Sequence, residues 1–295
     1  MSLPATYTTT APATAPKQST YSIAAAMTDP TSTDREAWNS RAKSYDTEPY
    51  MRKINTQIIE ALTSRLEWIG GGLNGGGGHD GGEKDGCRLL DYACGTGKIT
   101  MALRPYLTSA KGLDISTSMI DVYNQNMDAL RSSPSSSFPD GDDKIDNNND
   151  TRTATTNTTF HASATLGDFV AEVASGPSES DPEWTDFDVA AIGLGFHHFE
   201  NPELCLTRLA QRVKKATGVV LIIDWLPHAP HDDHNHDHGH SHDHGHKKKD
   251  EWEAMQKTIK HHGFDRQTMQ RMFEDAGLVD FDFVVLGEPF VLLPQ

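Results

Sequence analysis

Cysteine, long apolar runs and positive charge are all scarce in this chain of 295 residues. Its three cysteines, Cys87, Cys94 and Cys205, are too few and too widely spaced for a disulfide framework or a four-ligand zinc site. No run approaches the roughly 18 apolar residues of a membrane-spanning helix. The first 28 residues carry one charge, Lys17, and no apolar core of signal-peptide type. We therefore expect a cytoplasmic protein, or a nuclear one, with reduced cysteines and no membrane span.

The deficit of basic residues bears on the partners of the protein. Lys and Arg number 26 against 42 Asp and Glu, which gives a formal net charge of −16. Such a charge repels polyphosphates, and no stripe of basic and aromatic residues relieves it locally. We therefore expect no nucleic acid as a partner and favour a small molecule or a protein side chain as the substrate. No pattern in the sequence predicts an oligomeric state.

Four low-complexity stretches carry too little apolar surface to offset the entropy of ordering them. Residues 1–30 are rich in Thr, Ala, Pro and Ser, which predicts a disordered tail. Residues 70–86 are rich in Gly, and residues 132–157 are rich in Ser, Asp, Asn and Thr. Residues 228–250 are rich in His and Asp. About 200 residues remain, so we expect residues 31–295 to form a single domain with these stretches as loop insertions.

Outside these stretches, strand-like and helical periods alternate. Continuous apolar runs between helices are typical of a parallel sheet covered on both faces. The link between the last two extended runs is only residues 287–289, which predicts antiparallel pairing. We therefore expect an α/β fold, a Rossmann-like doubly wound mixed sheet of seven strands with an antiparallel C-terminal hairpin. The expected strands are 87–92, 111–115, 160–166, 187–192, 219–223, 279–286 and 290–293, and the expected helices are 34–44, 51–69, 98–106, 118–130, 203–213 and 266–275.

The most specific motif joins the first expected strand to its helix. Residues 89–99 read Leu-Leu-Asp-Tyr-Ala-Cys-Gly-Thr-Gly-Lys-Ile. In a doubly wound sheet such a turn is the usual cofactor crevice, because Gly95 and Gly97 let a ligand lie against the backbone beside free N–H groups. Thr100 replaces the third glycine of the dinucleotide fingerprint, and Asp91 would repel a pyrophosphate but attract a sulfonium group. The motif favours a cationic nucleoside, which makes an NAD-dependent reductase the least favoured enzyme class.

Two further acids end the next two expected strands. Asp114, followed by Ile115, is placed to accept hydrogen bonds from ribose hydroxyls. Asp168 and Phe169 offer a carboxylate and a ring face to an adenine. Each acid alone could instead cap the helix that follows it. Three acids at the tips of successive strands are harder to explain as caps, and together they predict one nucleoside site.

With these motifs, the sequence resembles the class I S-adenosylmethionine-dependent methyltransferases over nearly all of its foldable residues. Ala93 stands where that family most often has glycine. The most similar branch acts on small molecules and includes the quinone-biosynthesis C-methyltransferases and related O-methyltransferases. The resemblance implies S-adenosylmethionine as the cofactor, with Tyr45 in an N-terminal lid that closes over it. The cofactor-binding residues that it implies are Tyr45, Asp91, Ala93, Gly95, Gly97, Asp114, Ile115, Asp168, Phe169 and Gly193.

The resemblance further implies methyl transfer by in-line displacement to a small-molecule or lipid-like acceptor, at oxygen or carbon. His197 and His198 follow the fourth expected strand, near where the donor methyl should emerge. As catalytic residues, either could deprotonate a hydroxyl or an acidic carbon, but both could instead pack or cap the helix around Asn201. The acceptor pocket could also be bordered by the pairs at residues 224–225 and 261–262.

Two other functions stay open on the sequence alone. A protein methyltransferase or regulator on the same fold would meet its partner through the acidic surface. A non-catalytic module would sense metal through the nine histidines from His228 to His246, whose mostly alternate positions share a face in an extended chain. Because this tract has no defined ligand shell, we predict a solvated loop and no specific metal site.

Overall fold

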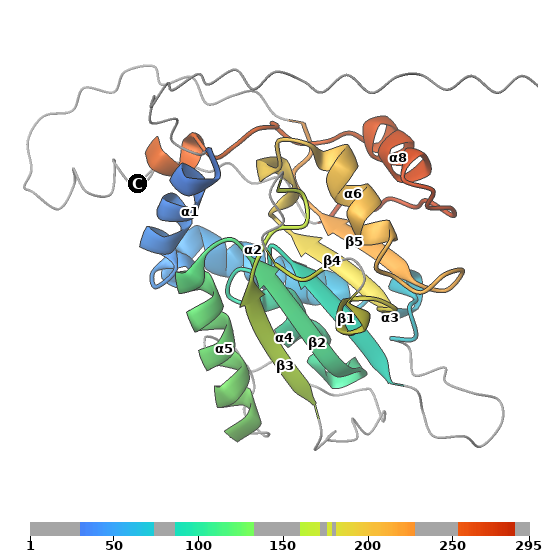
Figure 1. Cartoon of the computed structure of the whole chain (residues 1–295), viewed down its shortest axis with the longest axis horizontal. Helices are drawn as coiled ribbons and strands as arrows, with labels where there is room; N and C mark the ends of the chain where they lie inside the picture. Colours follow the sequence, from blue (N-terminus) through green and yellow to red (C-terminus); the bar gives the residue numbers. More distant parts are fainter. Residues whose placement is uncertain are drawn as a thin grey trace, which may run out of the picture.

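A parallel β-sheet forms the centre of the protein. The computed structural model describes residues 30–73, 86–132, 160–171, 176–178, 181–227 and 253–286. Within these ranges the sheet holds five strands in the order β3-β2-β1-β4-β5, and all neighbouring strands are parallel (Figure 1). They are β1 (Cys87–Tyr92), β2 (Leu107–Asp114), β3 (His161–Leu166), β4 (Val189–Gly193) and β5 (Val219–Ile223). The strand order reverses at the carboxyl end of β1, which is where a doubly wound sheet opens a crevice for a ligand.

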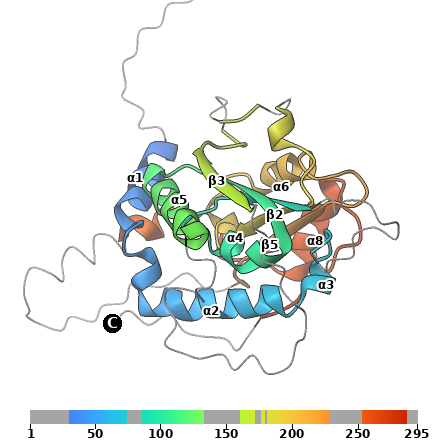
Figure 2. The same ribbon diagram turned by 90° about the horizontal axis from the view of Figure 1, so that it is seen from below.

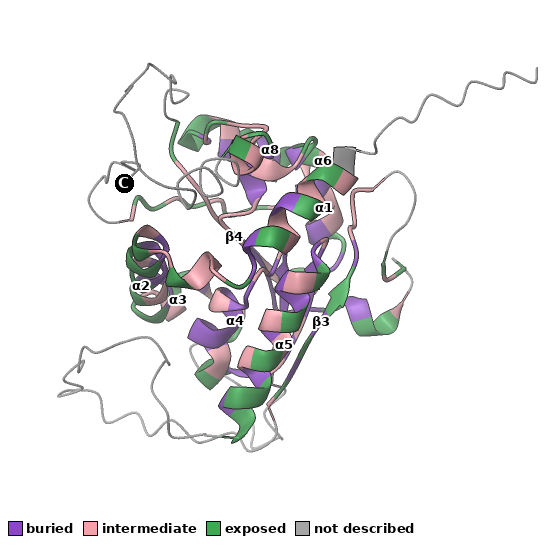
Figure 3. Cartoon of the chain, turned by 90° about the vertical axis from the view of Figure 1, so that its left-hand side faces the viewer, coloured by how far each residue is buried: buried purple, intermediate pink, exposed green. Residues whose placement is uncertain are grey.

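Helices cover both faces of this sheet (Figures 1 and 2). They are α1 (Pro30–Arg41), α2 (Pro49–Thr63), α3 (Leu66–Ile69), α4 (Lys98–Leu103), α5 (Thr117–Ser132), α6 (Pro202–Ala210) and α8 (Arg266–Asp275). Side chains of α2, α4 and α5 form one core cluster with the sheet, and those of α6 and α8 form another. Successive strand residues face opposite ways, so Leu89 joins the first cluster and Leu90 the second. Buried residues accordingly gather on the strands and on the helix sides that face them (Figure 3).

The predicted alternation of strands and helices is confirmed, but several bounds differ: β2 begins at Leu107 instead of 111, α1 spans Pro30–Arg41 instead of 34–44, and α6 ends at Ala210 instead of 213. The helix expected over 51–69 is interrupted at Ser64, where α2 ends and the short α3 follows. The helix expected over 98–106 ends at Leu103 and continues as a single 3-10 turn, η2 (Arg104–Tyr106). Pro105 explains this change, because it has no N–H to donate to the α-helical ladder.

The C-terminal part differs from the expected antiparallel hairpin. Residues 279–286, expected as the sixth strand, lie in the described part of the chain and belong to none of its strands. Side chains hold this segment instead: Phe281 and Phe283 pack against the second core cluster, and Asp282 accepts a hydrogen bond from Trp68 Nε1 at 2.7 Å. The last expected strand, 290–293, lies outside the described residues, so the structure supports an α/β fold with five parallel strands.

Other sequence expectations fall on parts of the chain that the structure leaves undescribed. These are the tail up to residue 29, nearly all of the three expected insertions, and the histidine tract. Among the helices within the described ranges, none combines the length and apolarity needed to cross a bilayer.

Candidate active site

The turn after β1 contains two glycines, Gly95 and Gly97, that lack a side chain for different reasons. Ala93, Gly95 and Gly97 have φ angles of 52°, 50° and 89°, in the left-handed region that L side chains rarely adopt. A Cβ atom at Gly95 would meet nothing within 4 Å, whereas one at Gly97 would lie 2.8 Å from Tyr123 Cδ2 of α5. Gly95 therefore leaves open space beside the turn, and Gly97 allows α5 to pack closely against it.

Asp91 is fixed to the first turn of α4. The residue is 1% exposed, and its Oδ2 accepts hydrogen bonds from Thr100 N at 3.3 Å and from Thr100 Oγ1 at 2.7 Å. Tyr123 donates in turn to Thr100 Oγ1 at 3.0 Å. Burial raises the pKa of the Asp91 carboxyl to about 7 despite these bonds. The threonine at the place of the fingerprint's third glycine thus holds the first of the three acids.

Asp114 links the end of β2 to the glycine turn. Its Oδ2 accepts a hydrogen bond from Gly95 N at 2.8 Å, and its Oδ1 accepts one from Ser116 N at 2.8 Å. Burial raises the pKa of this carboxyl to about 6. The bond to Ser116, just before α5, fits the capping alternative, but the bond across to Gly95 does not. Asp114 therefore belongs to the crevice as well as to the start of the helix.

The side chains of Asp168 and Phe169 lie in different surroundings: Asp168 borders the crevice, and Phe169 packs against the core. Asp168 Oδ1 accepts hydrogen bonds from Tyr92 Oη at 2.5 Å and from Val170 N at 2.9 Å, which fixes its carboxylate. The ring of Phe169 lies under the guanidinium group of Arg212, with Cζ 3.7 Å from the ring centroid, and 4.9 Å from the ring of Tyr92. Phe169 is thus a packing residue of the second core cluster, and Val170 lies at the crevice instead.

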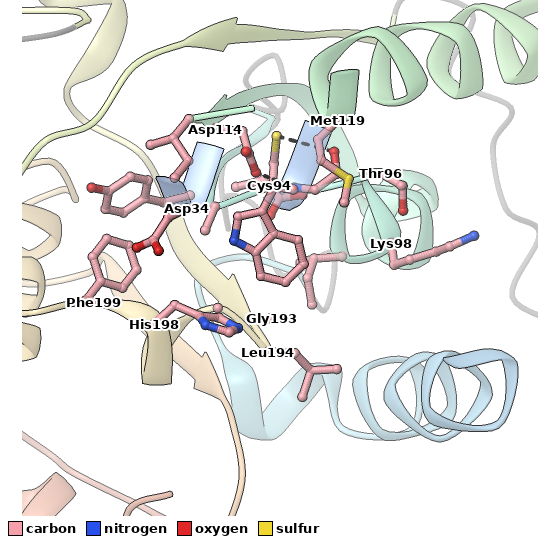
Figure 4. A pocket seen from close by; sticks show the side chains of 18 of the residues that line it. Asp34, Cys94, Thr96, Lys98, Asp114, Met119, Gly193, Leu194, His198 and Phe199 are labelled. Carbon is pink, nitrogen blue, oxygen red and sulfur yellow. Dashed lines mark hydrogen bonds between the residues drawn. The ribbon is translucent and has the colours of Figure 1, made fainter. Parts of the chain in front are cut away.

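These elements enclose a first cavity of about 730 Å³ at the carboxyl end of β1. Figure 4 shows Asp114, Met119 and Thr96 along one side and His198, Phe199 and Leu194 along the other. Gly97 and Phe169 are the two predicted cofactor-binding residues that do not line this cavity. The predicted residues that do line it are Tyr45, Asp91, Ala93, Gly95, Asp114, Ile115, Asp168 and Gly193.

The N-terminal elements close the first cavity. Arg35 Nε of α1 donates a hydrogen bond to Ile115 O at 3.1 Å. In the 3-10 turn η1 (Tyr45–Thr47), Asp46 accepts a hydrogen bond from Thr96 Oγ1 at 3.1 Å and pairs with Lys98 Nζ at 3.2 Å. Sequence analysis did not name Arg35, Thr96 or Lys98 as cavity residues. Thr96 and Lys98 lie within the glycine motif itself, whereas Arg35 reaches the cavity through a contact between segments far apart in the chain. The lid, α1 with η1, is thus tied directly to the glycine turn and to the tip of β2.

A second cavity of about 770 Å³ adjoins the first. Apolar side chains dominate its wall, and they come from α2, from the end of β5, from residues 255–264, from α8 and from residues 281–286. Six residues line both cavities, so the two spaces meet. The shared residues are Trp38, Tyr45, Met51, Ile58, Leu194 and His198.

The two predicted catalytic histidines have different surroundings. His197 is 6% exposed and lines the second cavity; its N–H donates to Asp224 Oδ2 at 3.0 Å, and its Nδ1 lies 2.7 Å from Asp224 Oδ1. His198 lies between Trp38 and the ring of His197, with Nδ1 3.0 Å from Thr258 O. Burial, helped by the neighbouring His197, lowers the pKa of His198 to about 3.

The helix-capping alternative for these histidines does not hold, because Asn201 Oδ1 itself accepts the hydrogen bond from Leu204 N at 2.8 Å. Of the other residues predicted to border the acceptor pocket, Asp224, Trp225 and His262 line the second cavity. His261 does not line it, and its Nε2 lies 3.1 Å from Phe199 O at hydrogen-bond distance.

Comparison with known proteins identifies the family. The model of a family described as a methyltransferase domain matches residues 50–281. The chain belongs to this methyltransferase family. An uncharacterized methyltransferase of Schizosaccharomyces pombe is 23% identical over 205 residues, which cover 68% of this chain and 57% of the relative. The chain thus spans little more than half the length of that methyltransferase.

Two solved methyltransferases are similar at the level of the fold. One is magnesium protoporphyrin IX methyltransferase from Synechocystis PCC 6803 with bound SAH, at 12% identity and a TM-score of 0.47 over 83% of this chain and 88% of that one. The other is phosphoethanolamine N-methyltransferase 2 of Haemonchus contortus with S-adenosyl-L-methionine, at 15% identity and a TM-score of 0.43 over 82% and 42%.

The first cavity of this methyltransferase domain fits S-adenosylmethionine, the cofactor that the sequence predicts. Five acidic side chains line the cavity, among them Asp91, Asp114 and Asp168, and a sulfonium cation is compatible with them where a pyrophosphate is not. The two cationic side chains that line it, Arg35 and Lys98, are engaged with Ile115 O and Asp46. The open space beside Gly95 leaves room for a ligand against the backbone. Across the described ranges, no cluster of three or more His, Cys, Asp or Glu side chains is placed to hold a metal ion.

Proposed function

We propose that this methyltransferase acts on a small-molecule or lipid-like acceptor, at oxygen or carbon. The observation that carries the proposal is the pair of joined cavities, one bordered by carboxylates and the other by apolar side chains. A donor and an acceptor bound in the two spaces would meet at their junction, beside Leu194 and His198. The apolar wall favours an acceptor that is itself largely apolar, since transfer of apolar surface from water stabilises the complex.

The cofactor would bind in the first cavity. S-adenosylmethionine supplies a methyl group on a sulfonium, whose departure as a thioether needs no general acid. Asp114 would accept hydrogen bonds from the ribose, Asp168 would face the adenine, and Asp91 and Gly95 would border the amino-acid end. Tyr45, on the lid, would separate the reacting atoms from water. The work of the protein is then to position two molecules, which alone accelerates a bimolecular reaction greatly.

Isothermal titration calorimetry of the full chain with S-adenosylmethionine tests the cofactor assignment. We expect binding in the micromolar range and a loss of at least about tenfold in affinity in Asp114→Asn, which keeps the shape of the side chain but removes its charge. Asp128→Asn, on the exposed side of α5, is the matched control, because the Asp128 side chain is 71% exposed and forms its ion pair with Arg131 on the same helix. Absence of binding heat in the unmodified protein would refute the proposal.

The acceptor assignment has its own test. The protein is incubated with tritiated donor and a fractionated cell extract, and the label is followed into small molecules, lipids and proteins. The proposal expects label in an organic-soluble fraction, whereas label confined to protein would contradict it.

A further inference from the structure

We propose that His197 and Asp224 form a base dyad that deprotonates a phenol-type hydroxyl on a hydrophobic acceptor, so that the reaction is an O-methylation. The inference rests on the proposed function, and it narrows the acceptor from any small or lipid-like molecule to a hydroxyl-bearing aromatic one. It also assigns the proton transfer to one member of the histidine pair.

The geometry of the dyad carries the first step. Asp224 directly follows β5. Its Oδ2 accepts a hydrogen bond from the backbone N–H of His197 at 3.0 Å, and its Oδ1 lies 2.7 Å from the ring Nδ1 of the same residue. The side chains are 4% and 7% exposed, so the pair is shielded from water. A carboxylate at Nδ1 fixes the tautomer in which Nδ1 carries the proton. Nε2 then keeps its lone pair, and His197 belongs to the wall of the second cavity, next to the ring of His198 at the junction, with ring centroids 4.0 Å apart.

His198 is unsuited to the same role. Its Nδ1 faces Thr258 O and Thr258 Oγ1, each at 3.0 Å, and no carboxylate orients it. Burial keeps its pKa far below the physiological range, so it takes up a proton poorly. Its ring instead stands at the junction of the two cavities, where it can pack against the acceptor. The other charged groups nearby are Lys260 and its partners Asp34 and Glu200, which are paired among themselves at 3.6 and 3.2 Å.

The second cavity indicates the class of acceptor. Aromatic side chains form much of its wall, and its volume of about 770 Å³ is that of a site for a drug-sized molecule. Aromatic rings pack well against a flat ring and an alkyl chain. A phenol is also the group for which a base helps most, because its ordinary pKa of about 10 leaves it neutral at physiological pH. The aromatic lining residues are Trp38, Tyr45, Tyr50, Trp68, Trp225, Phe264, Phe273, Phe281 and Phe283.

The atoms of the step balance. The O–H bond of the acceptor breaks, and its proton passes to Nε2 of His197. The oxygen lone pair forms the new C–O bond while the S–CH₃ bond of the donor breaks, and that electron pair stays on sulfur. The products are a methyl ether, a thioether and one proton, which His197 releases to water after the product leaves. No oxidant, reductant or metal takes part.

The experiment uses the full-length protein with tritiated donor and three probes: para-propylphenol, para-nonylphenol and para-nonylaniline. We expect the methyl ether of the phenols as product, a KM at least about tenfold lower for the nonyl than for the propyl compound because of the additional buried methylenes, and little transfer to the aniline.

Two variants test the dyad itself. Asp224→Asn is isosteric, and we expect its kcat to fall about 100-fold at pH 7 with unchanged cofactor affinity. The deficit should shrink at pH 10, where the phenol ionises without a base; a merely structural role for Asp224 would not give this recovery. His197→Gln should behave in the same way, and Asp128→Asn should match the unmodified protein.

Three results would overturn the inference: an N- or C-methylated product, full kcat of Asp224→Asn at pH 7, or no transfer to either phenol. In each case calorimetry with S-adenosylmethionine separates the two levels of the argument. Retained cofactor binding would refute the phenol acceptor and the dyad alone, whereas absence of cofactor binding would refute the proposed function beneath them.

Discussion

The two cavities are built in different ways. Directional hydrogen bonds fix the wall of the first: Asp91 is tied to Thr100, Asp114 to Gly95, and Asp168 to Tyr92. Apolar side chains from five separate segments form most of the wall of the second, with the His197–Asp224 pair as its most constrained polar element. Hydrogen bonds specify positions, whereas apolar contact specifies little beyond volume. We infer that the first cavity is built for one ligand and that the second can change its ligand by substitution of single side chains.

The strongest test of this contrast is Gly97→Ala, which adds one methyl group behind the first cavity. Its Cβ would lie 2.8 Å from Tyr123 and would sit on a backbone with φ of 89°. We expect a loss of about 3 kcal/mol in the free energy of unfolding, measured by urea denaturation, from backbone strain and overpacking together.

Gly277→Ala is the matched control for strain alone. Gly277 follows α8 with a φ of 80°, but a Cβ there would meet nothing within 4 Å. We expect this variant to lose only about 1 kcal/mol. Equal losses in the two variants would mean that packing behind the glycine turn is not tight.

The next effect is a pH dependence of cofactor affinity. Asp91 and Asp114 have pKa values of about 7 and about 6, both raised by burial, so both are mainly neutral at pH 5 and mainly ionised at pH 8. A cation prefers the ionised form. We expect the affinity for S-adenosylmethionine to rise about tenfold from pH 5 to pH 8, with proton release detected as a dependence of the binding heat on the buffer.

The same pKa values also predict how the stability of the protein without cofactor depends on pH. The folded state binds more protons than the unfolded state between the ordinary carboxyl pKa of 3.8 and about 7, so its free energy of unfolding falls as the pH rises through this window. Asp91→Asn should weaken the pH dependence of both the cofactor affinity and the free energy of unfolding. An affinity that falls with rising pH would show that these acids do not face a cation.

A third prediction separates the two residues at the tip of β3. Phe169 packs in the core under Arg212, whereas its neighbour Val170 lines the first cavity. Phe169→Leu should cost about 1 kcal/mol of stability and leave cofactor affinity within about twofold. Val170→Phe should narrow the cavity and weaken cofactor binding with a smaller effect on stability. The reverse pattern, measured by calorimetry and urea denaturation, would return Phe169 to the cofactor site.

The sequence predicts the first cavity better than the second. The first cavity lies at the tips of successive strands, so local motifs such as Asp91 with Gly95 sufficed to predict the part of its wall that those strand tips supply. Phe169 does not line this cavity, because a ring next to an acid on a strand tip can turn into the core or out of it, and here it packs against Arg212. The dyad joins residues 27 positions apart, His197 in the 3-10 turn after β4 and Asp224 directly after β5. Nothing in the local pattern of either segment predicts that pairing.

The smallest expected effect concerns the lid, which touches both cavities through Tyr45. Asp46→Asn removes the ion pair with Lys98, a partly exposed pair worth about 0.5 kcal/mol, and keeps an oxygen for the bond from Thr96. We expect the release of cofactor to become about twofold faster, measured by stopped-flow tryptophan fluorescence, to which Trp38 contributes from the cavity wall, 6.0 Å from the ring of Tyr45. Asp128→Asn should release it at the original rate. A change in the KM of the acceptor without any change in cofactor release would mean that the lid belongs to the second cavity rather than to the first.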